Sequence, residues 1–270
     1  MKNLIIGAGN MGEAILDVWF KSSILKREKY LIIEKNKSKL NKLRKKYKTI
    51  EILNEIPNFW AGDCLYLFVK PQALDEVAKE IMRKDIAFKV LVSIMAGISV
   101  INLKKKINLP VETLVLRAMP NINTKEKRGI TFLFSNKKQS IISKIAKKKF
   151  LSLGKIVWLK KEESMHIATA IFGSGPAYFF LFYKILIEIA ENSGFNKKLS
   201  KELITTTAEG SLLMCKKEKN ILGLIEDVTS PGGTTEAALN VLNFENKFAS
   251  ILKKAINAAS KKSKELSKRK

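Results

Sequence analysis

Hydrophobic and polar positions follow two different patterns in the two parts of this 270-residue chain. In the first part, short apolar runs bounded by turn residues alternate with stretches in which apolar residues recur at helical spacing. Such runs predict buried strands, and the helical spacing predicts amphipathic helices. The predicted strands cover residues 2–6, 30–34, 64–69, 89–93, 113–116, 131–134 and 155–159. The predicted helices between them cover residues 13–20, 37–46, 73–82, 100–106 (with Ser99 as N-cap) and 139–152.

This alternation is typical of an α/β Rossmann fold, in which helices cover both faces of a mainly parallel, doubly wound sheet. After Lys160 only helical patterns remain. They cover residues 163–172, 176–193, 199–217, 221–228, 234–243 and 246–268. We therefore predict an α/β domain over residues 1–160, followed without a long linker by an all-α domain over residues 161–270.

The first predicted strand leads into Gly7-Ala8-Gly9-Asn10-Met11-Gly12, which opens the first predicted helix. A Gly-x-Gly-x-x-Gly pattern between a strand and a helix is typical of a dinucleotide-binding loop. Gly7 allows the tight turn, Gly9 lets the backbone approach a pyrophosphate, and Gly12 lets the helix pack on the strand. The helix N-terminus, with Asn10 and Met11, would then bind the phosphates. The alternative is a glycine-rich loop without a ligand.

Glu34 ends the second predicted strand, where an acidic residue can accept hydrogen bonds from the adenosine ribose hydroxyls. Its carboxylate would repel a 2′-phosphate, although Lys35 and Lys37 are close enough to offset this. A surface glutamate without a ligand is the alternative. The cofactor is therefore predicted as NADPH or NADH, without a preference.

Further cofactor candidates lie at or just after other predicted strand ends, where doubly wound sheets bind their ligands. They are Val69, Lys70, Pro71, Ala96, Gly97 and Asn121. Lys70 could equally be a surface lysine whose aliphatic stem packs on apolar groups. Asn121 could bind a polar edge of the nicotinamide or substrate, or could cap a turn.

In the second half, Ser230-Pro231-Gly232-Gly233-Thr234-Thr235 is the densest run of turn and helix-start residues. It would present backbone N–H groups at the positive end of the helix over residues 234–243, which suits a carboxylate. The alternative is a tight turn before a surface helix. Glu218 is as consistent with a solvated charge as with a site residue, and His166 is more often structural in such a setting.

The composition of the chain predicts its cellular location and argues against a metal site and a membrane span. The two cysteines, Cys64 and Cys215, cannot form a disulfide framework or a metal site by themselves, so we expect reduced thiols, no metal and a cytoplasmic location. The N-terminal apolar run is too short for a signal peptide. Residues 167–189 resemble a membrane span, but a Gly-Ser-Gly-Pro break, Lys184 and Glu188 favour two buried helices and no membrane.

The net charge of +25 raises the possibility of nucleic-acid binding. However, the lysines are scattered, and the basic runs at residues 44–46 and 147–149 lie on predicted surface helices. No zinc-finger or RNA-binding motif accompanies them. We therefore predict a solvated basic surface that attracts anionic ligands in general but has no nucleic-acid partner.

Five sequence blocks, taken in order, carry a resemblance that extends nearly from end to end. They are Gly7-Ala8-Gly9-Asn10-Met11-Gly12, Val69-Lys70-Pro71-Gln72, Arg117-Ala118-Met119-Pro120-Asn121, Gly173-Ser174-Gly175-Pro176-Ala177-Tyr178 and Asp227-Val228-Thr229-Ser230-Pro231-Gly232-Gly233-Thr234-Thr235. In these blocks the chain resembles the pyrroline-5-carboxylate reductases. Many dehydrogenases share the first block, whereas the last is highly specific to this family.

The resemblance implies reduction of L-1-pyrroline-5-carboxylate to L-proline with NADPH or NADH, the last step of proline biosynthesis. It also implies that the helical domain binds the substrate and interlocks with a second subunit, and that the dimers can assemble into decamers. By position, Ser230, Gly232, Gly233 and Thr235 match the substrate loop of the family, and Glu218 matches an acidic residue near it.

The expected chemistry is hydride transfer, in which the protein orients the reactants. The N–H groups from Gly232 to Thr234 would hold the substrate carboxylate, and the catalytic candidate Thr235 would lie near the imine nitrogen. A β-hydroxyacid dehydrogenase is a second possibility, but its catalytic lysine on the second domain has no counterpart here in a fitting motif. A nucleotide-sensing or nucleic-acid-binding protein that kept the fold is a third.

Overall fold

The computed structural model describes residues 1–22, 25–137 and 140–268. The chain forms two compact units, one made of Met1–Ser174 with Ala259–Lys270 and the other of Gly175–Ala258. Strands give way to helices after β10 (Gly154–Trp158), next to the boundary predicted at residue 160. The compact units divide elsewhere, because α6 (Ser164–Ala168) packs on β9 (Gly129–Ser135), and residues 263–267 pack against Gly97 and Asn102 of the first unit.

The first unit is built on an eight-stranded sheet with the order β10-β9-β8-β7-β5-β1-β2-β3. Its strands are β1 (Lys2–Ile6), β2 (Lys29–Ile33), β3 (Glu51–Leu53), β5 (Cys64–Leu67), β7 (Val90–Ser93), β8 (Leu114–Pro120), β9 (Gly129–Ser135) and β10. All neighbouring strands are parallel except β8 and β9. The predicted doubly wound α/β fold is therefore confirmed. Three three-residue strands were not predicted, namely β3, β4 (Phe59–Ala61) and β6 (Asp85–Ala87).

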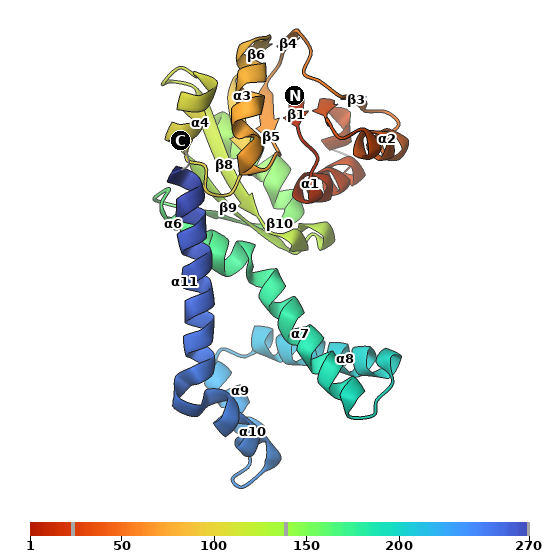
Figure 1. Ribbon diagram of the computed structural model, residues 1–270, viewed down its shortest axis with the longest axis vertical. Helices are drawn as coiled ribbons and strands as arrows, with labels where there is room; N and C mark the ends of the chain where they lie inside the picture. The colour runs from red at the N-terminus through yellow and green to blue at the C-terminus, as the bar shows by residue number, and fades with distance from the viewer. Residues whose placement is uncertain (23–24, 138–139, 269–270) are drawn as a thin grey trace. The chain divides into compact units, whose positions relative to one another are not determined.

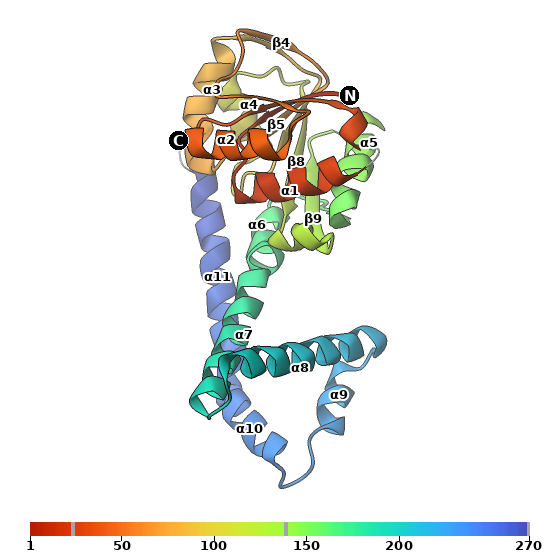
Figure 2. The same cartoon turned by 90° about the vertical axis from the view of Figure 1, so that its right-hand side faces the viewer.

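Helices cover both faces of this sheet because each buried strand sends alternate apolar side chains to opposite sides. On β1, Ile5 packs in one cluster of apolar residues, while Leu4 and Ile6 belong to another. The first cluster includes residues of α1 (Asn10–Lys21), α2 (Lys37–Lys46) and α5 (Ser140–Ile145). The second includes residues of α3 (Leu74–Met82) and α4 (Val100–Ile107), and Figures 1 and 2 show these helices around the sheet.

Side-chain caps explain where several helices begin. The Ser99 hydroxyl accepts a hydrogen bond from the Asn102 N–H at 3.1 Å, which confirms it as the N-cap of α4. Asn36 caps α2 and Asn220 caps α9 (Ile221–Asp227) in the same way. Each cap of this kind stabilises its helix by about 0.5–2 kcal/mol.

The second unit contains only helices among its described elements. They are α7 (Gly175–Asn192), α8 (Lys197–Lys217), α9, α10 (Thr234–Asn243), the short helix η7 (Phe244–Asn246) and the first part of α11 (Lys247–Lys268). Before them, α6 (Ser164–Ala168) continues into a π-helical turn, η6 (Thr169–Gly173). These bounds follow the predicted helical ranges closely.

The predicted burial of α7 is wrong for the single chain. Phe179 is 67% exposed and Phe180 is 61% exposed, and neighbouring apolar side chains are exposed as well. The helical run Ser164–Asn192 is long and apolar enough to cross a membrane by length and composition alone. An apolar helical pattern predicts that the side chains are buried, but it does not indicate whether the same chain or a partner subunit buries them.

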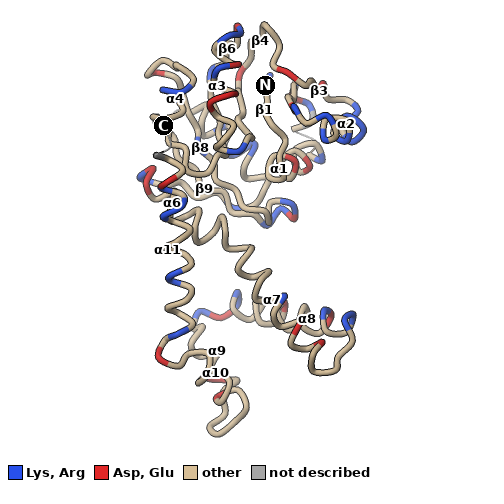
Figure 3. The backbone as a smooth tube through the Cα atoms, viewed as in Figure 1, with Lys and Arg blue, Asp and Glu red and all other residues tan. Residues whose placement is uncertain are grey.

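The basic run at residues 147–149 also differs from its prediction. Lysine and arginine occur in both units (Figure 3), yet Lys149 is completely buried in the π-helical turn η4 (Ala146–Phe150). Its ammonium group lies 2.6 Å from both the Glu28 carboxylate and the Tyr30 hydroxyl. Lys149 is therefore part of the interior and adds nothing to a basic surface.

Candidate active site

The glycine-rich loop lies at the carboxyl end of β1, between β5 on one side and β2 on the other. The order of the strands reverses at this point, which is where doubly wound sheets bind ligands. Gly7 has φ = +89°, and a Cβ atom there would lie 2.6 Å from the Val69 side chain. A Cβ at Gly12 would lie 3.3 Å from the Phe68 side chain. Gly7 and Gly12 thus let the loop and α1 pack tightly against the end of β5.

Gly9 has a different environment, because among the described residues only the Phe68 carbonyl oxygen, at 3.9 Å, lies within 4 Å of its potential Cβ. Gly9 is exposed and starts α1 without a side-chain cap, and the first helical bond runs from the Glu13 N–H to the Gly9 carbonyl. Within residues 1–22, the N–H groups of Asn10, Met11 and Gly12 therefore remain available at the positive end of the helix. This open cradle fits a pyrophosphate.

Glu34 is fixed beside this cradle. Its carboxylate accepts hydrogen bonds from the N–H groups of Ala8 at 3.1 Å and Asn36 at 3.0 Å. Lys35, which the sequence suggested could offset the Glu34 charge, instead pairs with two carboxylates of α3, Glu76 at 2.6 Å and Glu80 at 2.8 Å. The carboxylate of this candidate residue is thus held by two backbone hydrogen bonds, and Lys35 pairs with α3.

The candidates after β5 and β7 belong to the same sheet edge. Val69 packs against Gly7, Lys70 is exposed, and Pro71 starts the short helix η2 (Pro71–Ala73). Ala96 is half-buried, whereas Gly97 is buried against the C-terminal end of α11. Gly97 therefore packs the loop against Ser263 and Leu266 of α11. The sequence did not indicate this contact.

The side chain of Asn121 is engaged inside the fold. Its amide nitrogen donates to the Phe172 carbonyl at 3.1 Å, and its amide oxygen accepts from the Ile130 N–H at 3.2 Å. Only 5% of the residue is exposed. This geometry favours the structural alternative for Asn121, which joins the start of β9 to the end of η6.

The substrate-loop candidates form a turn followed by a helix. The Gly233 N–H donates to the Ser230 carbonyl at 2.9 Å, with Pro231 and Gly232 at the two central positions. Gly232 has φ = +74°, as the second central position of a type II turn requires. Gly233 then caps α10 with its backbone alone. The predicted turn and helix start are present in the structure.

Glu236 changes the expected anion site. Its carboxylate accepts a hydrogen bond from the Gly232 N–H at 2.7 Å, and the Gly233 N–H is used within the turn. Within residues 140–268, the N–H groups of Thr234, Thr235 and Glu236 at the start of α10 remain open. The expectation that Gly232 and Gly233 themselves offer free N–H groups is therefore wrong. An acidic residue at the third helical position, as in a capping box, was the signal for this contact.

Thr235 is adjacent to this turn in the chain, whereas Glu218 lies at the end of another helix, α8. Thr235 is half-buried in the first turn of α10. Glu218 is exposed at the end of α8, where its carboxylate accepts from the N–H of Lys219 at 2.9 Å. Helix α9 separates Glu218 from the loop in sequence, and the hydrogen bond of Glu218 among the described residues is with Lys219.

A doubly wound sheet with an open glycine-rich cradle, followed by an all-helical unit, defines a dinucleotide-dependent oxidoreductase. Two family models match the chain: "NADP oxidoreductase coenzyme F420-dependent" over residues 3–97 and "Pyrroline-5-carboxylate reductase dimerisation" over residues 162–266. The pyrroline-5-carboxylate reductase of Haemophilus influenzae is 31% identical over 267 residues, which cover 97% of this chain and 96% of that protein. The chain therefore belongs to the pyrroline-5-carboxylate reductase family.

Solved structures agree with this assignment. A Plasmodium falciparum pyrroline carboxylate reductase with NADP bound has a TM-score of 0.81 and 29% identity, covering 98% of both chains. The 1-pyrroline-5-carboxylate reductase of Streptococcus pyogenes has a TM-score of 0.84 and 25% identity, also covering 98% of both chains. The fold and the family resemblance predicted from the sequence are thus confirmed, and the β-hydroxyacid dehydrogenase alternative is not.

The dimerisation segment also explains the apolar surface of α7. Phe179 and Phe180 lie within the matched residues 162–266. The protein is a homo-oligomer, and its partner subunit can cover apolar side chains that the single chain leaves exposed.

Proposed function

We propose that this chain reduces L-1-pyrroline-5-carboxylate to L-proline by hydride transfer from NADH or NADPH. One observation carries the proposal. This member of the family has both the open cradle at the start of α1 and the turn and helix start at residues 230–235. The first suits a dinucleotide, and the second suits the carboxylate of a small acid.

The cofactor residues follow from the cradle. The N–H groups of Asn10, Met11 and Gly12 would bind the pyrophosphate, and Gly9 leaves room for it to approach. Glu34 would accept from the ribose hydroxyls. Six further residues remain proposed neighbours of the cofactor: Val69, Lys70, Pro71, Ala96, Gly97 and Asn121. Because Gly97 and the side chain of Asn121 are packed inside the fold, these two would shape the backbone near the cofactor. The cofactor, when bound, supplies the hydride.

The substrate residues follow from the turn. The N–H groups of Thr234, Thr235 and Glu236 would hold the substrate carboxylate, and the Glu236 side chain would turn away when it binds. Ser230, Gly232 and Gly233 give the turn its shape, and Glu218 is proposed near the substrate. The hydride adds to the imine carbon, the C=N bond becomes a single bond, and the nitrogen takes a proton. The Thr235 hydroxyl would orient that nitrogen.

Cofactor oxidation with the imine tests this function directly. We expect purified protein to oxidise NADH or NADPH, and to form proline, only when L-1-pyrroline-5-carboxylate is present. A sample without imine measures background oxidation, and circular dichroism verifies folding. Folded protein that turns over neither cofactor in the presence of the imine would contradict the proposal.

We also propose that the oligomer is a homodimer that can assemble into a decamer, as the family resemblance implies. Light scattering on the purified protein should then give two or ten times the chain mass of 30.4 kDa. A different multiple would contradict this assembly. The cytoplasmic location and the lack of nucleic-acid and membrane partners remain predictions from the sequence.

A further inference from the structure

The last ten described residues of α11 pack with the first unit, directly behind a candidate cofactor loop. This C-terminal segment, residues 259–268, contacts the loop between β7 and α4, which contains Ala96 and Gly97. Ser263 is buried although it is polar, with 4% of its surface exposed. The contact is therefore a packed interface inside the unit.

Gly97 brings the loop and the segment into backbone contact. It has φ = +79°, and a Cβ atom there would lie 2.7 Å from the Leu266 Cβ and 2.8 Å from the Ser263 carbonyl oxygen. Both the conformation and the space at this position exclude a side chain. The segment thus fixes how far the loop can move away from the dinucleotide edge of the sheet.

Hydrogen bonds hold the segment in register with α4 and α6. The Asn102 amide nitrogen donates to the Ser267 carbonyl at 2.6 Å, and His166 Nδ1 lies 2.9 Å from the Ser263 hydroxyl. Asn102 belongs to the first turn of α4, which begins right after the loop. The segment is therefore tied to the element that anchors the loop on its C-terminal side.

Glu162 anchors the start of α4 from another direction. Its carboxylate accepts from the Val100 N–H at 2.8 Å and from the buried Arg117 guanidinium at 2.7 Å. Together with the C-terminal segment, this ion pair leaves the loop little freedom on the side away from the sheet edge.

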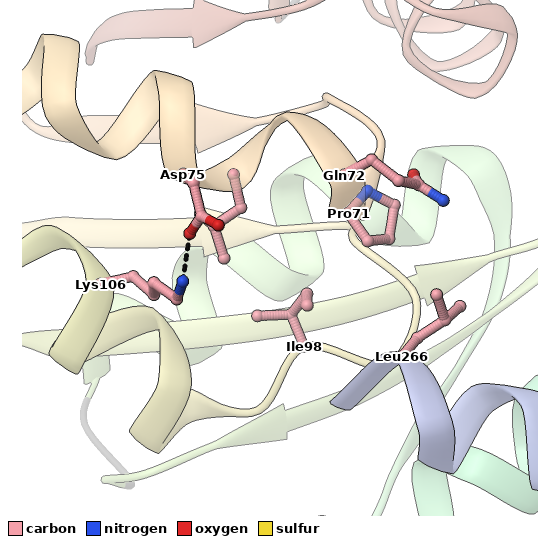
Figure 4. Close-up of a pocket in the computed structure, with 7 residues that line it drawn as sticks. Pro71, Gln72, Asp75, Ile98, Lys106 and Leu266 are labelled. Carbon is pink, nitrogen blue, oxygen red and sulfur yellow. Dashed lines mark hydrogen bonds and ion pairs between the residues drawn. The ribbon is translucent and has the colours of Figure 1, made fainter. Parts of the chain in front are cut away.

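Leu266 also borders the second candidate cofactor loop. It lines a cavity of about 210 Å³ together with Pro71 and Gln72, which follow β5, and Ile98, which follows β7 (Figure 4). The ion pair between Asp75 and Lys106 closes the other end. One side chain from the C-terminal segment thus packs against Gly97 after β7 and lines a cavity with Pro71 and Gln72 after β5.

We propose that the C-terminal segment is a positioning element for the dinucleotide, and that Leu266 is its key residue. By packing against Gly97 and forming one wall of the cavity next to Pro71, Leu266 holds both loops in the conformation that the bound cofactor requires. The inference rests on the proposed function only in assuming that these loops face NAD(P)H. In this proposal Leu266 acts through the two loops.

Equilibrium binding of NADPH and NADH, followed by cofactor fluorescence on the full-length protein, tests the proposal. We expect Leu266→Ala to raise the cofactor Kd about tenfold, because the loops lose part of their packing and even a misplacement of about 1 Å can cost about 100-fold. Leu266→Met, which keeps the volume, should restore binding. Ile101→Ala is the matched control, because Ile101 is 74% exposed on α4 and loses a similar side chain.

Steady-state kinetics should show the same selectivity. In Leu266→Ala the KM for the cofactor should rise, while the KM for the imine at saturating cofactor should stay unchanged. If Leu266→Ala is recovered unfolded, Asn102→Ala, which removes the bond to Ser267, replaces it in both measurements. A variant that melts earlier but binds cofactor as tightly as wild type would overturn the proposal and leave the segment a purely structural role.

The binding titration needs no turnover, so it separates this inference from the proposed function. Wild-type protein that binds NADPH but reduces no imine would contradict the reductase function and leave the inference standing. Wild-type protein that reduces the imine, with Leu266→Ala binding cofactor normally, would contradict only the inference. Wild-type protein that binds neither cofactor would contradict both.

Discussion

The Glu34 carboxylate accepts a hydrogen bond from the Ala8 N–H at 3.1 Å, and this bond ties the end of β2 to the glycine-rich loop. The acidic side chain is therefore held in place before any cofactor arrives. A dinucleotide lying on the N-terminus of α1 would bring its adenosine ribose to this carboxylate. Ribose hydroxyls can donate to it, whereas a 2′-phosphate would meet a fixed negative charge.

Cofactor preference should follow from this arrangement. We expect wild-type protein to use NADH at least as well as NADPH, and Glu34→Gln to raise the NADPH-to-NADH ratio of kcat/KM about tenfold, or about 1.4 kcal/mol. Lys35→Gln is the control, because Lys35 pairs with Glu76 and Glu80 and should change the ratio little. A strong NADPH preference that Glu34→Gln leaves intact would refute the assignment.

Gly7 and Gly9 should respond differently to the same substitution. Alanine at Gly7 combines a positive φ with a Cβ 2.6 Å from Val69, so Gly7→Ala should lower the melting temperature and weaken cofactor binding. Alanine at Gly9 meets only an oxygen at 3.9 Å, so Gly9→Ala should keep wild-type stability and still lose cofactor affinity through contact with the pyrophosphate. Thermal melts and NADPH titrations on both variants measure this. Equal cofactor affinity in Gly9→Ala and wild type would argue against the cradle.

The buried Lys149 should make a large contribution to stability through Glu28. Burial lowers the pKa of Lys149, while the Glu28 carboxylate at 2.6 Å opposes that shift. Lys149→Met removes one charged hydrogen bond but leaves the Glu28 carboxylate paired with Lys148 at 2.5 Å, so we expect a loss of about 1.5–3 kcal/mol in the free energy of unfolding. Adding Glu28→Gln should recover much of it. Urea unfolding of the three proteins gives these values, and a double variant less stable than the single one would contradict this account.

His166 should make stability depend on pH near neutrality. Burial lowers its pKa, and the positive charges of Arg117 and Lys264 lower it further, against the opposing effect of Glu162 and Glu163. The unfolded chain therefore binds a proton more readily than the native one. Stability is complete above the unfolded pKa of 6.5 and is lost as pH falls toward the lower native pKa.

Urea unfolding at about pH 7.5 and about pH 5.5 checks this prediction, because His166 is the one histidine of the sequence and unperturbed carboxylates titrate below this range. Wild-type protein should lose stability between the two pH values, and His166→Gln should lose less. The same loss in both proteins would exclude His166 as its cause.

Local chemistry made much of the fold and site predictable from the sequence. The N-cap Ser99 and the turn at residues 230–233 depend on neighbouring residues alone, and they form as predicted. The strands β3, β4 and β6 were missed because three residues are too few to establish a period. The burial of Lys149 and the contact between Gly97 and Leu266 join residues far apart in sequence, which a local pattern does not report.

Thr235 should affect chemistry more than stability. It lies in the first turn of α10, but the N-cap of that helix is Gly233, which has no side chain to form a cap hydrogen bond. Replacing Thr235 by valine keeps the shape and removes a hydroxyl that can donate to or accept from the imine nitrogen. If that hydrogen bond strengthens in the transition state, Thr235→Val should lower kcat/KM about tenfold or more, or about 1.4 kcal/mol, with little change in melting temperature.

Thr234→Val is the matched control, because Thr234 is the neighbouring, exposed threonine of the same helical turn. Its kcat/KM should stay close to wild type, since the backbone N–H that holds the substrate carboxylate is retained. The alternative role of Thr235 as a cap makes the opposite prediction, a loss of about 0.5–2 kcal/mol in stability with normal turnover. Because the two roles move different quantities, melting curves and initial rates on the two valine variants decide between them.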